Sequence, residues 1–230
     1  MIFILTGAGI SRESGLETFR DAAGLWNKVR IEDVATIEAF RRNPQKVYEF
    51  YNQRRRQLLS IEPNAAHRAL AELEKSGQKI FLVTQNVDNL HERSGSTVVL
   101  HMHGRLLAAA CQECGLSLEW PGDLGGDDKC PGCGGTLRPD VVWFGEKPYY
   151  LDEIERAINQ CRVFVSIGTS GTVYPAAGLV TRAKANGTRT VELNLEPSRN
   201  RSSFDQGFYG PATEVVPVWV ESVLAQGNKC

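Results

Sequence analysis

Short apolar runs rich in β-branched residues alternate along the chain with stretches of helical period. This alternation is typical of parallel strands joined by crossover helices. The expected strands are Ile2–Thr6, Lys79–Thr84, Val98–His101, Val163–Ile167, Thr190–Leu193 and Glu214–Val216. The expected helices are Asn64–Ser76, Asp152–Gln160, Ala176–Asn186 and Pro217–Gln226. The pattern predicts an α/β fold with a Rossmann-like, doubly wound parallel sheet.

Two segments interrupt the alternation. Residues 28–62 have helical period throughout, including a helix over Gln45–Ser60, and contain no candidate strand. Residues 108–137 are rich in glycine and cysteine, which indicates a compact metal-binding ribbon. We expect residues 28–62 and 108–137 to form a small domain beside a main domain made of residues 1–27, 63–107 and 138–230.

Composition narrows the class of protein. The 230 residues carry a formal net charge of −1, which gives no long-range attraction to nucleic acid or to anionic lipid. No apolar run approaches the roughly 20 residues that span a membrane. The apolar start, Met1–Leu5, lacks the basic flank of a secretory signal and is expected to be a buried strand. We therefore expect a cytoplasmic monomer without nucleic-acid or membrane partners.

Four of the six cysteines form two Cys-x-x-Cys pairs, Cys111 with Cys114 and Cys130 with Cys133. Four thiolates at this spacing predict one tetrahedral zinc site without an open position, and hence a structural metal. The alternative, two reduced thiol pairs or disulfides, does not explain the symmetric spacing. Of the remaining two, Cys161 is expected to be a core thiol and Cys230 a free one.

The first expected strand leads directly into Thr6-Gly7-Ala8-Gly9-Ile10-Ser11. Small residues at a strand end let backbone N–H groups approach a pyrophosphate, although a tight turn alone would also account for the two glycines. No third glycine follows Gly9 at the dehydrogenase spacing, and no acidic residue ends the next strand. Hydride-transfer chemistry is therefore disfavoured.

Polar side chains also follow the second strand, in Thr84-Gln85-Asn86-Val87-Asp88. Open α/β sheets bind ligands at such strand ends, but an Asx turn or a helix cap is an equal alternative. Further on, His101 and His103 lie two residues apart. Histidine is the natural general base near neutral pH, and at least one of this pair is expected to be a buried, hydrogen-bonded core residue.

Taken together, these motifs resemble those of the sirtuin family and occur in the family's order over nearly the whole chain. The matching segments are Gly7-Ala8-Gly9-Ile10-Ser11, Phe19-Arg20, Thr84-Gln85-Asn86-Val87-Asp88, His103-Gly104, the four cysteines, Val142-Trp143-Phe144-Gly145-Glu146, Gly168-Thr169-Ser170 and Asn194-Leu195-Glu196. The resemblance implies a protein-lysine deacylase that consumes NAD and holds a structural zinc. Its substrate would be an acylated lysine in a protein or peptide, and its products free lysine, nicotinamide and O-acyl-ADP-ribose.

The resemblance also assigns roles by motif position. His103 would be the general base, with Asn86 and Asp88 holding the nicotinamide ribose and carboxamide. The implied NAD-binding residues are Gly7, Ala8, Gly9, Ser11, Phe19, Arg20, Trp26, Gln85, Asn86, Val87, Asp88, Gly168, Thr169, Ser170, Asn194, Leu195, Glu196 and Ala212. The segment Val142, Trp143, Phe144, Gly145 and Glu146 would be the edge to which the substrate peptide adds as a strand.

One pair narrows the acyl group. Tyr51 and Arg54 lie three residues apart on the expected helix, where a phenol and a guanidinium can grip one carboxylate. By spacing alone, a tyrosine packed against an arginine is the commoner explanation. In the context Phe50-Tyr51-Asn52-Gln53-Arg54, however, the pair resembles the Tyr-x-x-Arg pair of the desuccinylating and demalonylating sirtuins. We therefore expect removal of succinyl and malonyl groups as well as acetyl.

Two other functions compete with this interpretation. The same NAD site could deliver ADP-ribose to a protein side chain, but that chemistry gives Tyr51 and Arg54 no task. A catalytically silent module that binds NAD or acylated peptide would have no need of His103 together with Asn86 and Asp88. A nicotinamide-release assay separates the silent module from the enzyme.

Overall fold

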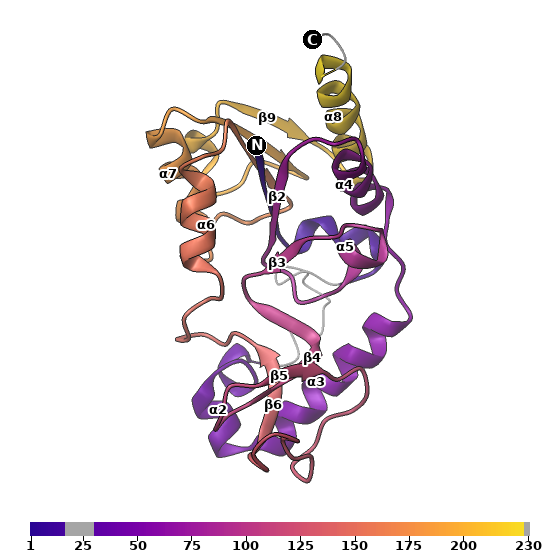
Figure 1. Cartoon of the computed structure of the whole chain (residues 1–230), viewed down its shortest axis with the longest axis vertical. Coiled ribbons are helices and arrows are strands. Elements are labelled where there is room, and N and C mark those ends of the chain that lie inside the picture. The colour runs from indigo at the N-terminus through magenta and orange to yellow at the C-terminus, as the bar shows by residue number, and fades with distance from the viewer. Residues whose placement is uncertain (17–29, 228–230) are drawn as a thin grey trace.

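The computed structural model describes residues 1–16 and 30–227 (Figure 1). Its main sheet has six parallel strands in the order β3-β2-β1-β7-β8-β9. These are β1 (Ile2–Thr6), β2 (Ile80–Thr84), β3 (Val99–His101), β7 (Val163–Ile167), β8 (Arg189–Asn194) and β9 (Gln206–Tyr209). Strand order reverses between β1 and β7, as in a Rossmann sheet. The predicted fold class is confirmed.

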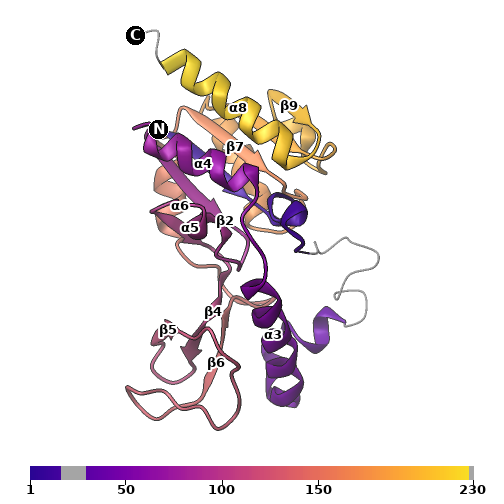
Figure 2. The ribbon, with the colours of Figure 1, turned by 90° about the vertical axis from the view of Figure 1, so that its right-hand side faces the viewer.

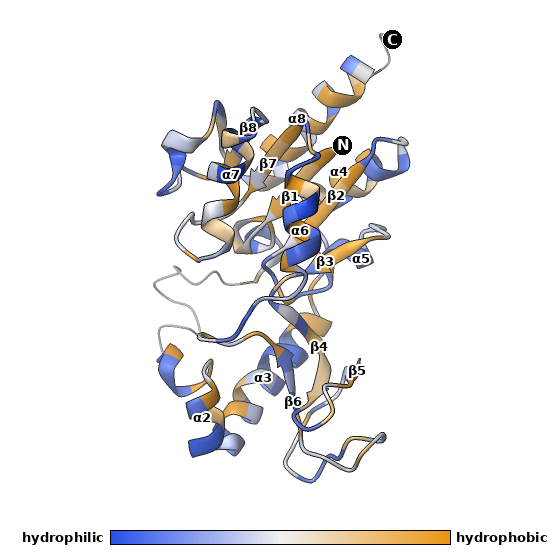
Figure 3. Ribbon diagram, turned by 60° about the vertical axis from the view of Figure 1, so that its left-hand side comes forward, coloured by the Kyte–Doolittle hydropathy of each residue, from blue (hydrophilic) through white to orange (hydrophobic). Residues whose placement is uncertain are grey.

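Helices cover both faces of this sheet, because β1 and its neighbours are apolar on both sides. Ile2 and Ile4 pack toward α4 (Ala65–Lys75) and α8 (Ala212–Gly227). Phe3 and Leu5 belong to the opposite core, with α6 (Leu151–Ile158) and α7 (Leu179–Ala185). Figure 2 shows α4 and α8 side by side, and Figure 3 shows the hydrophobic strands of the main sheet in orange beside the largely hydrophilic α6 in blue.

The expected strand Glu214–Val216 is wrong. These residues lie in α8, which begins at Ala212, and the sixth strand is the earlier segment β9. The β-branched pair Val215 and Val216 favours a strand locally. In the fold Val216 is fully buried against the sheet as part of a helix face, so tertiary packing outweighs the local preference.

A smaller domain lies at the far end of the molecule (Figure 1). It combines α2 (Ile37–Arg42) and α3 (Pro44–Leu59) with an antiparallel sheet in the order β5-β4-β6. The strands are β4 (Gly104–Cys111), β5 (Ser117–Glu119) and β6 (Leu137–Val141).

Shorter helices lie elsewhere along the chain. The 3-10 helices are η1 (Ala8–Ile10), η2 (Arg12–Ser14), η3 (Ile31–Asp33), η4 (Ala176–Gly178) and η5 (Arg201–Ser203), and α5 (Leu90–Arg93) follows β2. In the described residues, no helix has the length and apolar character needed to cross a membrane.

The two parts of the small domain share one apolar core, which contains Val47, Leu58, Leu106 and Leu137. A buried cation reinforces their contact. The guanidinium of Arg55, which is fully buried, donates to the carbonyls of Leu106 (2.8 Å) and Ala108 (3.2 Å) in β4. These bonds pair the buried guanidinium with β4 carbonyls, and they fix α3 against the sheet.

The turn that leads into β4 requires glycine. Gly104 has φ +83°, and a Cβ at this position would lie 2.1 Å from the carbonyl oxygen of Asp140. We expect Gly104→Ala to lower the free energy of unfolding by roughly 2–4 kcal/mol, from backbone strain plus the clash. Gly187 has φ +75° but no atom near the Cβ position, so Gly187→Ala should cost only about 1 kcal/mol. Urea unfolding of both variants measures the difference, and equal losses would show that the close approach to Asp140 is unimportant.

Candidate active site

The carboxyl ends of β1 and β7 meet through their backbones. Gly9 N donates to the carbonyl of Gly168 (2.9 Å), and a Cβ on Gly9 would lie 2.6 Å from Gly168 Cα. A Cβ on Gly7 would lie 2.9 Å from the carbonyl oxygen of Gly168, and one on Gly168, which has φ +62°, would lie 2.5 Å from Ile10 N. The glycines therefore allow these two turns to touch. Within the described residues the N–H of Ala8 donates to no backbone carbonyl, so this turn retains a donor suited to a phosphate oxygen.

Behind this turn lies a buried polar cluster from two segments, one that follows β1 and one that follows β2. Ser11 Oγ donates to Asp88 Oδ2 (3.0 Å) and accepts from Asn86 Nδ2 (3.2 Å). Asn86 Nδ2 also donates to the carbonyl of Gly7 (3.2 Å). Burial raises the pKa of Asp88, although hydrogen bonds from Leu90 N and Ser11 oppose the shift. The predicted residues of β1 and β2 are thus brought together at the point where parallel sheets bind ligands.

The two histidines of the β3–β4 connection differ in their surroundings. His101 is buried, with Nδ1 at 3.0 Å from the carbonyl of Asn86 and Nε2 at 2.7 Å from Glu92. His103 is half-buried, and its Nδ1 lies 3.0 Å from the carbonyl of Gln85. A carbonyl only accepts, so Nδ1 of His103 carries the proton and Nε2 is the basic nitrogen. Burial lowers the pKa of His103, with partial opposition from the Gln85 carbonyl, so the ring is neutral at pH 7.

The later strands contribute to the same edge of the sheet. Asn194 Nδ2, at the end of β8, donates to the carbonyl of Thr169 (2.9 Å), which follows β7. Thr169 Oγ1 lies 2.8 Å from Ser166 Oγ, and Ser170 Oγ lies 2.7 Å from Thr172 Oγ1. Leu195 and Glu196 follow Asn194 as exposed residues. Phe19, Arg20 and Trp26, also expected to bind the cofactor, lie outside the described residues.

Ala212 begins α8 next to the first turn. Glu13, in η2, accepts hydrogen bonds from Thr213 N (2.9 Å) and Thr213 Oγ1 (3.0 Å). Helix α8 therefore starts against the segment that follows the glycine turn. Neither Glu13 nor Thr213 could be recognised from the sequence, because the two residues are separated by 200 positions.

Tyr51 and Arg54 share one side of α3 but differ in exposure. Tyr51 is 3% exposed, and its hydroxyl accepts from Trp143 Nε1 (2.9 Å). Arg54 is half-buried, with its guanidinium carbon 5.7 Å from the centroid of the Phe50 ring. Burial raises the pKa of Tyr51 to about 12, and the Trp143 hydrogen bond and the charge of Arg54 limit the rise. The phenol is therefore neutral at pH 7 and able to donate.

Most backbone N–H groups of the Val142–Glu146 segment already donate hydrogen bonds to other groups of the protein. Val142 N donates to His103 O (2.9 Å), Trp143 N to Glu146 Oε2 (2.7 Å) and Phe144 N to Ala35 O (3.0 Å). Phe144 also forms an isolated parallel bridge with Thr36. In the described part of the chain Gly145 N has no backbone partner, and the side of the residue where a Cβ would lie is open. Gly145 is thus the point of this segment where another backbone can bind.

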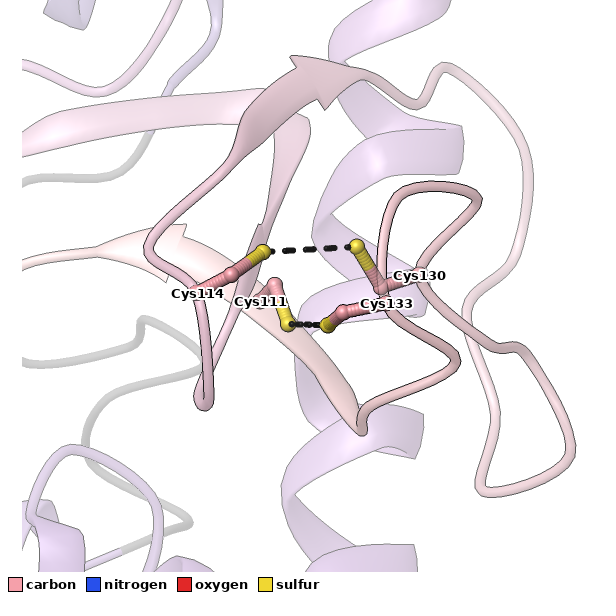
Figure 4. Close-up of side chains that lie close together, drawn as sticks. All are labelled: Cys111, Cys114, Cys130 and Cys133. Carbon is pink, nitrogen blue, oxygen red and sulfur yellow. Dashed lines mark hydrogen bonds between the residues drawn. The ribbon is translucent and has the colours of Figure 1, made fainter.

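The four predicted metal ligands converge (Figure 4). Their ligand atoms all lie within 4.8 Å of one another, with Sγ–Sγ distances of 3.5 Å for Cys111–Cys133 and 3.7 Å for Cys114–Cys130. A tetrahedral zinc with Zn–S bonds of about 2.3 Å requires sulfurs about 3.8 Å apart, so the thiols fit zinc. Each pair forms a matching knuckle, in which Gly115 N donates to Cys111 O and Gly134 N donates to Cys130 O. The cluster is suited to one structural zinc.

Two residues near the site were not foreseen. His67, in α4, places Nε2 at 3.4 Å from Ser11 Oγ and stacks edge-on against His91, with ring centroids 5.0 Å apart. Burial lowers the pKa of His67 to about 4, so the ring is neutral. Arg138, in β6, lies 3.5 Å above the Trp143 ring. The helical pattern marks His67 as an ordinary core position, and only the fold brings Arg138 over the indole.

These features define a class of protein: a Rossmann-type nucleotide-binding fold, with polar groups at the switch point of the sheet and a four-cysteine metal module. The Sir2 family model matches residues 7–175. An NAD-dependent protein deacylase of Leishmania major, SIR2rp3, is 57% identical over 99% of this chain and 97% of its own length. An NAD-dependent protein deacylase of Pasteurella multocida is 56% identical over 97% of each chain. The chain therefore belongs to the Sir2 family.

Solved structures agree with this assignment. A complex of a mutant Sir2 homologue with ADP-ribose superposes with a TM-score of 0.93 at 39% identity, covering 100% of this chain and 94% of that one. A complex of a Sir2 homologue with NAD gives a TM-score of 0.90 at 40% identity, covering 98% of this chain and 90% of that one. The resemblance inferred from the motifs is thus confirmed at the level of the family.

Proposed function

We propose that the protein is an NAD-dependent protein-lysine deacylase that removes acetyl groups and also the acidic succinyl and malonyl groups. It acts as a monomer on acylated lysine in proteins or peptides. The observation that carries the deacylase proposal is the placement of His103. Its Nδ1 is bound to the carbonyl of Gln85, in the strand end that also carries Asn86 and Asp88, which leaves Nε2 as the basic nitrogen. The two named relatives and the NAD and ADP-ribose complexes support the same cofactor.

NAD, when bound, would supply a ribose carbon as the acceptor for the acyl oxygen and nicotinamide as the leaving group. With one water molecule consumed, the products would be free lysine, nicotinamide and O-acyl-ADP-ribose. The protein's own residues would hold NAD and the acylated lysine in the orientation needed for reaction. Ala8 N and the turn around Gly7 and Gly9 bind phosphate, while Ser11, Asn86 and Asp88 present a fixed polar wall to the nicotinamide ribose. Gly168, Thr169, Ser170, Asn194, Leu195 and Glu196 hold the adenosine half, with Gly7, Gln85, Val87, Phe19, Arg20, Trp26 and Ala212 completing the site.

His103 removes a proton from a ribose hydroxyl. A base for this step must be neutral at working pH and must present one lone pair in a fixed direction. The Gln85 carbonyl fixes the tautomer of His103, and burial keeps the ring unprotonated. Asn86 and Asp88 are held by Ser11, so they orient the hydroxyl without adjusting during the reaction.

The acidic-acyl specificity rests on Tyr51 and Arg54. An indole N–H only donates, so the Tyr51 hydroxyl must accept from Trp143 and keeps its own hydrogen for another acceptor. Arg54 supplies a positive charge close enough to affect the pKa of Tyr51. A neutral donor beside a cation suits a carboxylate better than a methyl group. The substrate backbone binds along Val142–Glu146, where Gly145 N is the donor left for it.

The test compares two of three adjacent arginines, Arg54 and Arg56, which differ in their surroundings. Arg54→Met is expected to lower kcat/KM for a succinyl-lysine peptide about 10- to 100-fold more than for the matching acetyl peptide, since it removes a charged hydrogen-bond donor. Arg56 is exposed and pairs with Asp123 (2.6 Å), so Arg56→Met should leave the ratio of kcat/KM for the two peptides unaltered. Arg55 is unsuitable as a control because it is buried in the fold.

NAD-dependent nicotinamide release, measured with each acyl peptide, reads out both parts of the proposal. If the wild type releases nicotinamide with neither peptide, the deacylase function is wrong. If the wild type deacylates, but Arg54→Met lowers kcat/KM equally for both acyl peptides, the deacylase function stands and only the proposed acidic-acyl specificity is wrong. Nicotinamide release accompanied by ADP-ribose on the peptide would instead indicate ADP-ribosyl transfer.

A further inference from the structure

The direction of the Tyr51 hydroxyl depends on a side chain outside the acyl site. Trp143 Nε1 donates to this hydroxyl at 2.9 Å, and both rings are buried, at 2% and 3% exposure. The O–H bond of a phenol has two favoured orientations in the plane of the ring, and the hydrogen-bond partners decide between them. Within the described residues, this single bond is the only hydrogen bond of the Tyr51 hydroxyl, so the position of the indole decides where its hydrogen points.

Arg138 holds that indole in place. Its guanidinium carbon lies 3.5 Å from the centroid of the Trp143 ring, within cation–π contact. The guanidinium plane is itself fixed by Glu146, through bonds of 2.6 Å and 2.9 Å, and by the carbonyl of Val141 at 2.7 Å. A bidentate pair of this kind sets orientation as well as distance.

Glu146 completes the arrangement from the other side. Its Oε2 also accepts from Trp143 N (2.7 Å), so one carboxylate fixes both the backbone of Trp143 and the cation above its ring. The Arg138 and Glu146 side chains are only 12% and 24% exposed. Burial would raise the pKa of Glu146, but the bonds from Arg138 and Trp143 N outweigh it and lower the pKa. The pair stays charged at neutral pH and cancels its own charge.

We propose that Arg138 is a positioning residue for acidic-acyl specificity, acting through Trp143 on the Tyr51 hydroxyl. This rests on the proposed deacylase function. Arg138 fixes the indole, the indole N–H occupies the acceptor lone pair of Tyr51, and the hydroxyl hydrogen is directed to one carboxylate oxygen of the acyl group. Arg54 binds the other oxygen. The ion pair that Arg138 forms with Glu146 is neutral as a unit, so Arg54 provides the net positive charge at this end of the acyl group.

A double-mutant cycle tests the chain of contacts. Tyr51→Phe should lower the ratio of kcat/KM for succinyl over acetyl peptide about tenfold, mainly through the KM of the succinyl peptide. Arg138→Met should lower the same ratio about fivefold or more, and Arg138→Lys, which keeps the cation, should recover part of it. Because Arg138 acts through Tyr51, the double variant should match Tyr51→Phe alone, whereas independent effects would multiply.

A second variant protects the test against misfolding. Trp143→Phe keeps an aromatic ring beneath Arg138 but removes the N–H, so it should also lower the ratio and show no further effect in the Tyr51→Phe background. Zinc content and thermal unfolding report on folding in each case. Multiplicative effects, or equal losses for both acyl groups, would overturn the proposal and leave Arg138 a structural residue. A wild type that deacylates neither peptide would instead refute the function on which it rests.

Discussion

Replacing His103 with alanine is expected to lower kcat for deacylation of either acyl peptide by about 10²- to 10⁴-fold, the usual contribution of a positioned general base. NAD affinity should change little, because other residues are proposed to hold NAD, and in the described part of the chain the hydrogen bond of the His103 ring goes to the Gln85 carbonyl. Single-turnover nicotinamide release separates the chemical step from binding. An alanine variant with more than a tenth of wild-type activity would exclude His103 as the base.

His101 provides the matched control. Both of its ring nitrogens are engaged, by the Asn86 carbonyl and by Glu92, and the residue is 5% exposed. Its replacement should therefore lower the thermal midpoint of the fold, with loss of activity in proportion to unfolding. His103→Ala, in contrast, should leave the midpoint close to that of the wild type. The pair separates a catalytic histidine from a structural one.

The pH dependence has a definite sign. Burial lowers the folded-state pKa of His103 from its usual value, with the Gln85 carbonyl opposing part of the shift. The base is thus neutral at and above pH 7, and kcat/KM should fall only as the pH drops below about 6.5, through the lowered pKa. A pH profile of kcat/KM measures this limb. If kcat/KM already falls while the pH is lowered from 8 to 7, the assignment of His103 as the base is contradicted.

Removal of the metal should have the largest effect on stability. A chelator under reducing conditions is expected to unfold the small domain and abolish deacylation, since structural zinc binding contributes on the order of 10 kcal/mol in small zinc modules. Cys111 and Cys130 are themselves part of the apolar core that contains Tyr51 and Trp143. Loss of zinc therefore disturbs the acyl site as well as the ribbon.

Cys130→Ala should reproduce this loss, with zinc measured by mass spectrometry and folding by circular dichroism. Cys161→Ala is the control, because Cys161 is also a buried free thiol but lies in the core of the main domain. This variant should retain zinc and lose only about 1 kcal/mol of stability. A folded, active Cys130→Ala enzyme would show that the metal is dispensable.

The local sequence was sufficient to predict a helix or strand where the hydrophobic pattern and the residues that cap or end the element agreed. Helix α4 begins after Asn64, whose side chain caps it, and ends before Ser76, as expected from the sequence. The strand β9 was missed because Gln206–Tyr209 is short and contains a glycine, so it carries no apolar run. Its place in the sheet depends on pairing with β8, a contact that no local pattern encodes.

The site divides in the same way. Cysteine spacing was sufficient to predict the metal cluster, because two short knuckles each carry their own ligands. The spacing from Tyr51 pointed to Arg54 alone among the three consecutive arginines, and the burial of Arg55 was not predicted. Helix phase alone separates the buried Arg55 from the exposed Arg56. The stack of Arg138 on Trp143 spans a turn, whose geometry is set only when β6 is in place.

Strand order has a consequence for synthesis of the chain. The first strand made, β1, lies in the middle of the sheet, with β2 and β7 as its neighbours. During synthesis on the ribosome, Ile2 cannot form its strand pairs until its partners Ile80 and Val163 have been synthesised. Non-local pairing of this kind slows folding and leaves an apolar strand uncovered in the nascent chain. Chaperones that bind short apolar segments are thus expected to engage Ile2–Thr6 until the ribosome has passed β7.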